Sequence, residues 1–318
     1  MNFSILGVVS QFMALLVALI LAPLLTGWVQ QWRVRFQNKT APSILQPYRS
    51  LHKLFHKECL MEHNVTTLYR RAPYMVFGCM LLACAIVPTL STDLPLSPAA
   101  DAIALVGLFA LARVFISLAA MEVGSAFGTM GARREMLVGF LAEPALLMVL
   151  FCASMMTRST SLTTIVETIV QQDVVIHPSL LLAGVAFTMV SLAENARVPI
   201  DNPDTHLELT MIHEAMILEY SGRHLALWEW AASLKLFAYS CIGLAIFFPW
   251  GVAQAHDPLA LLWALPVLVF KLAVGGFLLA AIEAVSAKMR IFRVPEFLGT
   301  AFLLAVIGLL VNVLLGAR

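Results

Sequence analysis

The sequence predicts an all-α integral membrane protein, a bundle of eight transmembrane helices with an amphipathic cytoplasmic helix and an acidic cytoplasmic loop. Composition, the apolar runs and the distribution of basic residues predict this class. Hydrophobic residues make up 60% of the 318 residues and charged residues only 12%. Soluble domains average about 25% charged residues. We therefore expect a single polytopic membrane domain over residues 1–318, without a sizeable soluble domain.

Eight apolar runs are long enough, at about 20 residues each, to cross the hydrocarbon core of a bilayer. In chain order these predicted spans are 3–29, 73–91, 102–121, 136–157, 178–194, 226–249, 258–284 and 297–316. Four of the seven connections between them carry nearly all the basic residues. These four connections are approximately residues 30–72, 122–135, 195–225 and 285–296.

The basic residues set the predicted orientation. Fifteen of the 20 Lys and Arg residues lie in those four connections, whereas the other three connections contain only Arg158. Basic residues accumulate in cytoplasmic loops. The four basic connections are therefore predicted to be cytoplasmic, and both termini are predicted to be on the opposite side.

The first cytoplasmic connection contains the segment PYRSLHKLFHKE. Pro47 is suited to the first turn of a helix. Leu51, Leu54 and Phe55 fall on one face with Tyr48, and basic residues cover the rest. The pattern predicts an amphipathic helix at the membrane interface, although an ordinary juxtamembrane basic stretch would also fit.

The third cytoplasmic connection is unusually acidic. Asn202 and Pro203 are typical of a helix start, and the apolar residues Leu207, Met211, Ala215 and Leu218 follow at helical spacing. Clustered carboxylates oppose one another's ionisation, so some are expected to hold protons near neutral pH. The alternative is a solvated acidic face. His206 and His213 lack a recognised metal-ligand spacing, so no metal site is predicted.

Four charged residues lie inside the predicted spans, namely Arg113, Glu143, Lys235 and Lys271. A charge near the bilayer centre costs at least about 2.5–3.5 kcal/mol, and it persists mainly inside a bundle, paired or facing water. Arg113 and Glu143 are expected to pair between neighbouring helices. The four charges predict a proton or ion path, although salt bridges that only fix the helices would also explain them.

The five cysteines form no CxxC pair, and four lie in apolar runs. We interpret them as small buried hydrophobic residues and expect no redox cofactor in this chain.

Several short motifs occur together along the chain. They are GARRE at 131–135, AEP around Glu143, VPID at 198–201, EYSG at 219–222, SLK ending at Lys235, FKLAVGG around Lys271 and IEAVSAKMR around Glu283. Together they resemble the membrane subunit that anchors the catalytic arm in formate hydrogenlyase and other energy-converting [NiFe] hydrogenases. That subunit is similar to the quinone-site membrane subunit of respiratory complex I (the NADH dehydrogenase subunit 1 family). The resemblance covers essentially the whole chain.

This resemblance implies a non-catalytic subunit of a bacterial inner-membrane oxidoreductase complex. In that membrane, the orientation predicted from the basic residues makes both termini periplasmic. It would dock a hydrophilic oxidoreductase arm and couple electron transfer there to proton or sodium translocation. Iron–sulfur clusters and a [NiFe] centre would belong to the hydrophilic partner subunits. Antiporter-like membrane subunits and the lipid bilayer would be the other partners, and no nucleic acid is expected.

The resemblance also selects the residues expected to form a proton path. They are Arg113, Glu135, Glu143, Glu194, Asp201, Asp204, His206, Glu208, Glu214, Glu219, Lys235, Lys271 and Glu283. Relatives favour carboxylates near His206, and a histidine could carry a proton in their place. Three alternatives remain open: a quinone-reducing complex I subunit, a stand-alone secondary ion transporter, and a passive membrane anchor.

Overall fold

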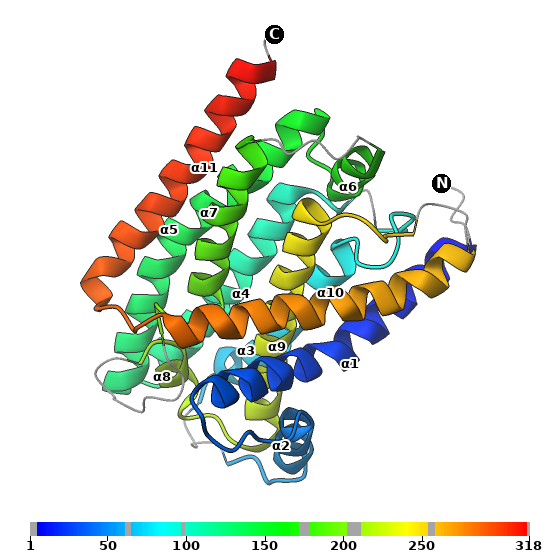
Figure 1. The fold of residues 1–318 in the computed structure, drawn as a ribbon. Coiled ribbons are helices and arrows are strands. Elements are labelled where there is room, and N and C mark those ends of the chain that lie inside the picture. The colour runs from blue at the N-terminus through cyan, green and yellow to red at the C-terminus, as the bar shows by residue number, and fades with distance from the viewer. Residues whose placement is uncertain are drawn as a thin grey trace.

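The computed structural model describes residues 5–60, 65–96, 99–171, 178–201, 211–253 and 258–316. Eight long helices overlap the eight predicted apolar runs (Figure 1). They are α1 (Ile5–Phe36), α3 (Thr67–Ile86), α4 (Ala102–Glu122), α5 (Ala126–Thr157), α7 (Pro178–Glu194), α9 (Gly222–Phe247), α10 (Pro258–Val285) and α11 (Val294–Gly316). The other helices of the described residues are short. They are α2 (Gln46–Phe55), α6 (Leu162–Gln171), α8 (His213–Ile217) and the 3-10 helix η2 (Ile291–Arg293).

Within the described residues, six helices are both long enough and apolar enough to cross a membrane. They lie at Gly7–Phe36, Ala102–Glu122, Ala126–Thr157, Gly222–Phe247, Ala260–Val285 and Ile291–Leu314. Helix α7 is equally apolar but has 17 residues, and α3 carries Arg70 and Arg71 in its first turns. The predicted all-helical membrane class is confirmed, and the number of spans remains a prediction.

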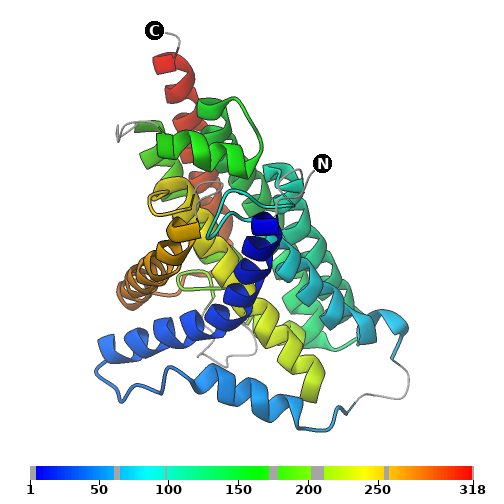
Figure 2. The same cartoon turned by 90° about the vertical axis from the view of Figure 1, so that its right-hand side faces the viewer.

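Two groups of helices differ in direction. Helices α3, α4, α5, α7, α9 and α11 run broadly along one axis, whereas α1 and α10 lie side by side and are strongly inclined to it (Figures 1 and 2). Trp28 of α1 donates a hydrogen bond to the carbonyl oxygen of Ala273 in α10, at 2.9 Å. Gly276 has no side chain, which leaves room for the indole of Trp28. The inclined pair therefore packs closely along its length.

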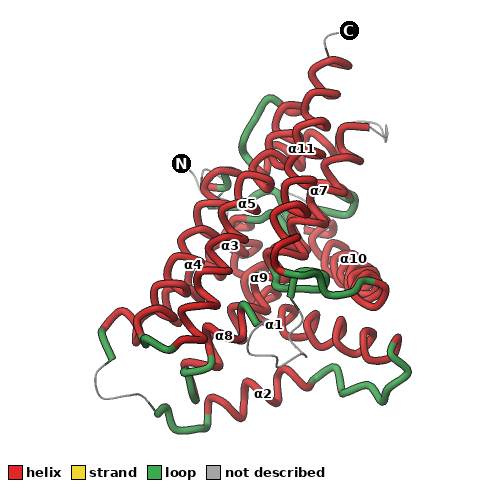
Figure 3. The backbone as a smooth tube through the Cα atoms, turned by 90° about the vertical axis from the view of Figure 1, so that its left-hand side faces the viewer, coloured by secondary structure: helices red, strands yellow, loops and turns green. Residues whose placement is uncertain are grey.

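Helix α2 crosses one end of the bundle, below α1 and α9 (Figure 3). Pro47 lies in its first turn and Leu51 is buried, as the amphipathic pattern predicts. A side chain at Gly27 of α1 would overlap the backbone carbonyl of Ile44. This glycine lets the segment that leads into α2 lie directly against α1.

The structure corrects two sequence-based boundaries. Helix α5 begins at Ala126, ten residues before the predicted apolar run, because the Ser125 hydroxyl accepts a hydrogen bond from Gly128 N at 3.2 Å and caps the helix. Glu135 therefore lies within a helix. The predicted apolar face through Leu218 is also wrong at that residue, because α8 ends at Ile217 and Leu218 is exposed. Residues 202–210, where the helix start was predicted, lie outside the described residues.

Candidate functional site

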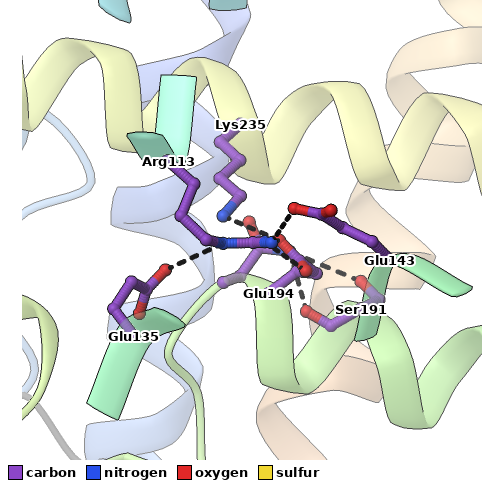
Figure 4. Close-up of polar contacts among 7 residues, drawn as sticks. Arg113, Glu135, Glu143, Ser191, Glu194 and Lys235 are labelled. Atoms are coloured by element: carbon purple, nitrogen blue, oxygen red, sulfur yellow. Dashed lines mark hydrogen bonds and ion pairs between the residues drawn. The ribbon is translucent and has the colours of Figure 1, made fainter. Parts of the chain in front are cut away.

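Five of the predicted site residues meet between four helices (Figure 4). Arg113 comes from the middle of α4, Glu135 and Glu143 from α5, Glu194 from the last position of α7, and Lys235 from the middle of α9. We call these five residues the Arg113 network. Residues far apart in the sequence thus form one polar cluster within an otherwise apolar bundle.

Arg113 is the centre of this network. Its guanidinium donates hydrogen bonds to the carboxylates of both Glu143 and Glu194, and its Nε lies 3.6 Å from Glu135 Oε1. Lys235 Nζ lies 3.0 Å from Glu194 Oε2. The predicted pairing of Arg113 with Glu143 is confirmed. Glu194 has two cationic partners, which the sequence did not indicate.

Burial makes these contacts energetically important. The exposed fraction of the side chain is 1% for Glu194 and 6% for Arg113. Removing one member of a buried ion pair costs about 3–5 kcal/mol, because the remaining charge is left without compensation. The network holds three carboxylates and two cations, so full ionisation leaves an excess of one negative charge. One proton shared among the carboxylates would balance the charge.

Gly139 provides the space for the guanidinium. A side chain at this position of α5 would overlap Arg113. Gly139 lies one turn from both Glu135 and Glu143 along the helix, so the same face of α5 supplies two carboxylates and a gap between them. Sequence reasoning missed this residue, although a glycine midway between two carboxylates in an apolar run was a visible signal.

A cavity of about 660 Å³ opens beside the network. It lies between α1, α2, α7, α8 and α9, and both Glu194 and Lys235 line it. Its other charged or titratable lining residues are Arg33, Arg197, Asp201, His213, Glu214 and Glu229. At about 30 Å³ per molecule, the volume corresponds to roughly twenty waters. The network therefore borders a large polar space near α2.

A second ionic cluster adjoins this cavity through Arg33, Arg197 and Asp201, which line it. Glu283 of α10 lies 3.6 Å from Arg33 Nη1 and 3.3 Å from Arg197 Nη1. Asp201 lies 3.0 Å from Lys288 Nζ and accepts a hydrogen bond from Ile212 N at 3.2 Å. The sequence indicated both carboxylates. The basic partners, Arg33, Arg197 and Lys288, were not predicted as site residues, because the sequence analysis used them only to predict the orientation of the helices in the membrane.

The remaining predicted residues are not part of the Arg113 network. Lys271 lies elsewhere in the bundle, where Nζ donates to the carbonyl oxygens of Phe248 (2.6 Å) and Trp250. Glu214 lines the cavity, and Glu219 is exposed. Asp204, His206 and Glu208 lie outside the described residues.

Glu229 was missed by sequence reasoning, although it is a carboxylate within the same apolar run as Lys235. Four of the five cysteines are buried. In the part of the chain that the structure describes, no group of three or more His, Cys, Asp and Glu residues could hold a metal ion. The Arg113 network brings three carboxylates and one lysine, all titratable groups, around a guanidinium that stays charged.

Comparison with known proteins identifies the family. The NADH dehydrogenase family model matches residues 9–314. Formate hydrogenlyase subunit 4 of Escherichia coli (strain K12) is 31% identical over 287 residues, which are 90% of this chain and 92% of that protein. Hydrogenase-4 component C of the same organism is 30% identical over 295 residues, which cover 92% of this chain and 91% of that protein.

A solved structure shares the fold. A chain of the membrane-bound sulfane sulfur reductase (MBS), an archaeal respiratory membrane complex, matches with a TM-score of 0.83. It is 21% identical, and the match covers 96% of this chain and 99% of that chain. The resemblance predicted from the motifs is confirmed. The chain belongs to the NADH dehydrogenase family, and formate hydrogenlyase subunit 4 and hydrogenase-4 component C are its relatives.

Proposed function

We propose that this protein is the membrane subunit of an energy-converting hydrogenase or formate-hydrogenlyase-type complex. It docks a hydrophilic oxidoreductase arm and couples electron transfer in that arm to proton or sodium translocation. The names of its two relatives support this assignment. Electrons pass through iron–sulfur clusters and a [NiFe] centre in the partner subunits.

The observation that carries the proposal is the position of the Arg113 network beside the polar cavity. Glu194 belongs to both, because it binds Arg113 and Lys235 and also lines the cavity. A water-filled cavity delivers protons to this carboxylate without exposing it to lipid. Arginine remains charged under all relevant conditions, so Arg113 fixes the geometry while the carboxylates and Lys235 exchange protons.

Glu143 is the end of the proposed proton path that lies towards the outer face of α5. Its side chain is 29% exposed, the largest exposed fraction among the carboxylates of the network. Phe140, one turn earlier on α5, is 80% exposed. A carboxylate beside exposed apolar surface within a bilayer is costly. We therefore propose that an antiporter-like membrane subunit covers this face of α5 and receives the proton.

The opposite end of the path faces the hydrophilic arm. Helix α2, the described residues of the acidic connection (195–201 and 211–225) and the cavity lie at one end of the bundle (Figure 3). In the proposed topology this end is cytoplasmic, eight helices cross the bacterial inner membrane, and both termini are periplasmic. The excess of basic residues in the connections at this end supports the orientation.

The same cavity is the reason to keep a quinone-reducing subunit as the second candidate. A volume of about 660 Å³ is within the range of small-molecule sites. Such sites are mostly apolar with a few polar groups, whereas several charged side chains line this cavity. The number of charged side chains in the lining makes water a better occupant of the cavity than a quinone ring. Quinone reduction by the purified complex, blocked by a site-directed inhibitor, would instead support the second candidate.

The test is proton translocation by the intact complex in proteoliposomes. Glu143→Gln keeps a hydrogen-bonding side chain but removes the acid, so the complex should assemble, turn over and lose proton translocation. Glu296→Gln alters an exposed carboxylate at the start of α11 and serves as the matched control. Normal translocation by the assembled Glu143→Gln complex would favour a passive anchor. Ion transport by the isolated subunit in liposomes would favour a stand-alone transporter.

A further inference from the structure

The C-terminal ends of α5 and α11 lie at the end of the bundle opposite α2 (Figure 1). A groove lies between them, and none of its lining residues belongs to the Arg113 network. It has a volume of about 1070 Å³. The last two turns of α5, the turn at 158–160 and the final turns of α11 form its walls. Its lining residues are Phe151, Ser154, Met155, Met156, Arg158, Ser159, Thr160, Leu309, Asn312 and Val313.

The groove contains one cation, Arg158, and its described lining residues include no carboxylate. Arg158 is exposed and ends α5 in a left-handed conformation, with φ at 55°. It makes no ion pair with a described residue. The guanidinium is therefore available to an anion from outside the chain.

Hydroxyl groups accompany this cation. Ser159 and Thr160 follow it directly in the groove wall. Ser154, one turn earlier on α5, also lines the groove, but its hydroxyl is buried and is not one of these donors. A guanidinium with neighbouring hydroxyl donors is suited to the oxygens of a phosphate group.

The rest of the groove is apolar. Phe151 lies seven residues before Arg158, which places it about 10 Å further along the helix axis. Met155 of α5, together with Leu309 and Val313 of α11, lines the part of the groove between Phe151 and Arg158. The polar end lies at the end of a membrane helix and the apolar end lies within its span. This gradient matches a lipid, with a headgroup at the interface and an acyl chain below it.

We propose that this groove binds one anionic phospholipid, with its phosphate at Arg158 and an acyl chain along Phe151, Met155 and Leu309. Charge complementarity favours this occupant over a zwitterionic lipid. Basic pockets between membrane helices bind anionic headgroups by the same chemistry. A single basic residue near the surface contributes about fivefold in affinity for an anionic lipid.

The test is lipid binding to the delipidated full-length protein, measured by native mass spectrometry. Phosphatidylglycerol and phosphatidylcholine are added back separately, and inorganic phosphate is added in a third arm. We expect one phosphatidylglycerol per chain to bind at least fivefold more tightly than phosphatidylcholine. Arg158→Gln should abolish this preference. Arg70→Gln removes an exposed arginine outside the groove and should preserve it.

A second variant tests the acyl site without changing charge. Met155→Trp fills the groove from an exposed position and should weaken phosphatidylglycerol binding while leaving the folded protein intact. Equal binding of the two lipids, or an unchanged preference in Arg158→Gln, would overturn the proposal. If inorganic phosphate at equal concentration displaced phosphatidylglycerol, the site would recognise only the phosphate group. This result would also contradict a lipid site.

Discussion

Lys235 and Lys271 are both lysines near the middle of apolar helices, but their surroundings differ. Lys235 binds the carboxylate of Glu194 at 3.0 Å and lines the large polar cavity. Lys271 binds the main-chain carbonyl oxygens of Phe248 and Trp250, and its Nζ lies 5.2 Å from the centre of the Trp250 ring. It forms no ion pair with a described carboxylate.

This difference teaches that a charged residue inside an apolar helix need not belong to a proton path, because main-chain carbonyl oxygens can also stabilise the charge. Lys235 faces a carboxylate, which is a group that can bind a proton, whereas Lys271 faces main-chain carbonyl oxygens, which only accept hydrogen bonds. The proposed function therefore uses Lys235 as a proton carrier. Lys271 is placed to fix the chain after α9 against α10, and its contacts give no support to its predicted place in the path.

The largest expected effect comes from Glu194→Leu. This change leaves Arg113 and Lys235 buried without their shared carboxylate, which should cost about 3–5 kcal/mol. Such a loss is comparable with the whole stability of many proteins. We expect poor accumulation and a strongly lowered melting temperature in detergent.

Adding Lys235→Met to Glu194→Leu sharpens this test, because Glu194 is the one carboxylate that pairs with Lys235 among the described residues, whereas Arg113 keeps Glu135 and Glu143. The double variant should be more stable than Glu194→Leu alone. A Glu194→Leu protein that melts like the wild type would show that the Arg113 network contributes little to folding.

A smaller effect is expected from Gly139→Ala, because the added methyl group would overlap the Arg113 guanidinium. Overpacking of this kind costs about 1–3 kcal/mol, and the displaced guanidinium should also impair coupling. Gly107→Ala is the matched control, since nothing lies within 4 Å of a side-chain carbon at this position of α4. Thermal unfolding of the two proteins measures the difference. Equal melting temperatures would contradict the assigned role of Gly139.

The smallest effect is expected from Lys271→Met. The change loses two charge-assisted hydrogen bonds but also removes the cost of burying a charge, so the net destabilisation should be about 1 kcal/mol. Hydrogen exchange should report faster opening around residues 248–253, while the Arg113 network stays protected. Faster exchange in α4 and α7 instead would show that Lys271 supports the network after all.

The sequence predicted the bundle well because apolar runs in membrane helices are long and unambiguous. It predicted the pairing of Arg113 with Glu143, because both charges needed a partner within the bundle. It could not separate Lys235 from Lys271, since their partners come from distant helices or from the main chain. Gly139 was missed for a related reason, as its role depends on a side chain from another helix.

The most direct test of the central claim compares Lys235→Met with Lys271→Met in the intact complex. Both variants are reconstituted in proteoliposomes, and the number of protons translocated per turnover is measured. We predict that Lys235→Met assembles and turns over but loses translocation, whereas Lys271→Met keeps the wild-type stoichiometry. Equal stoichiometry in the two variants, whether normal or lost, would contradict the distinction between the Arg113 network and the Lys271 site.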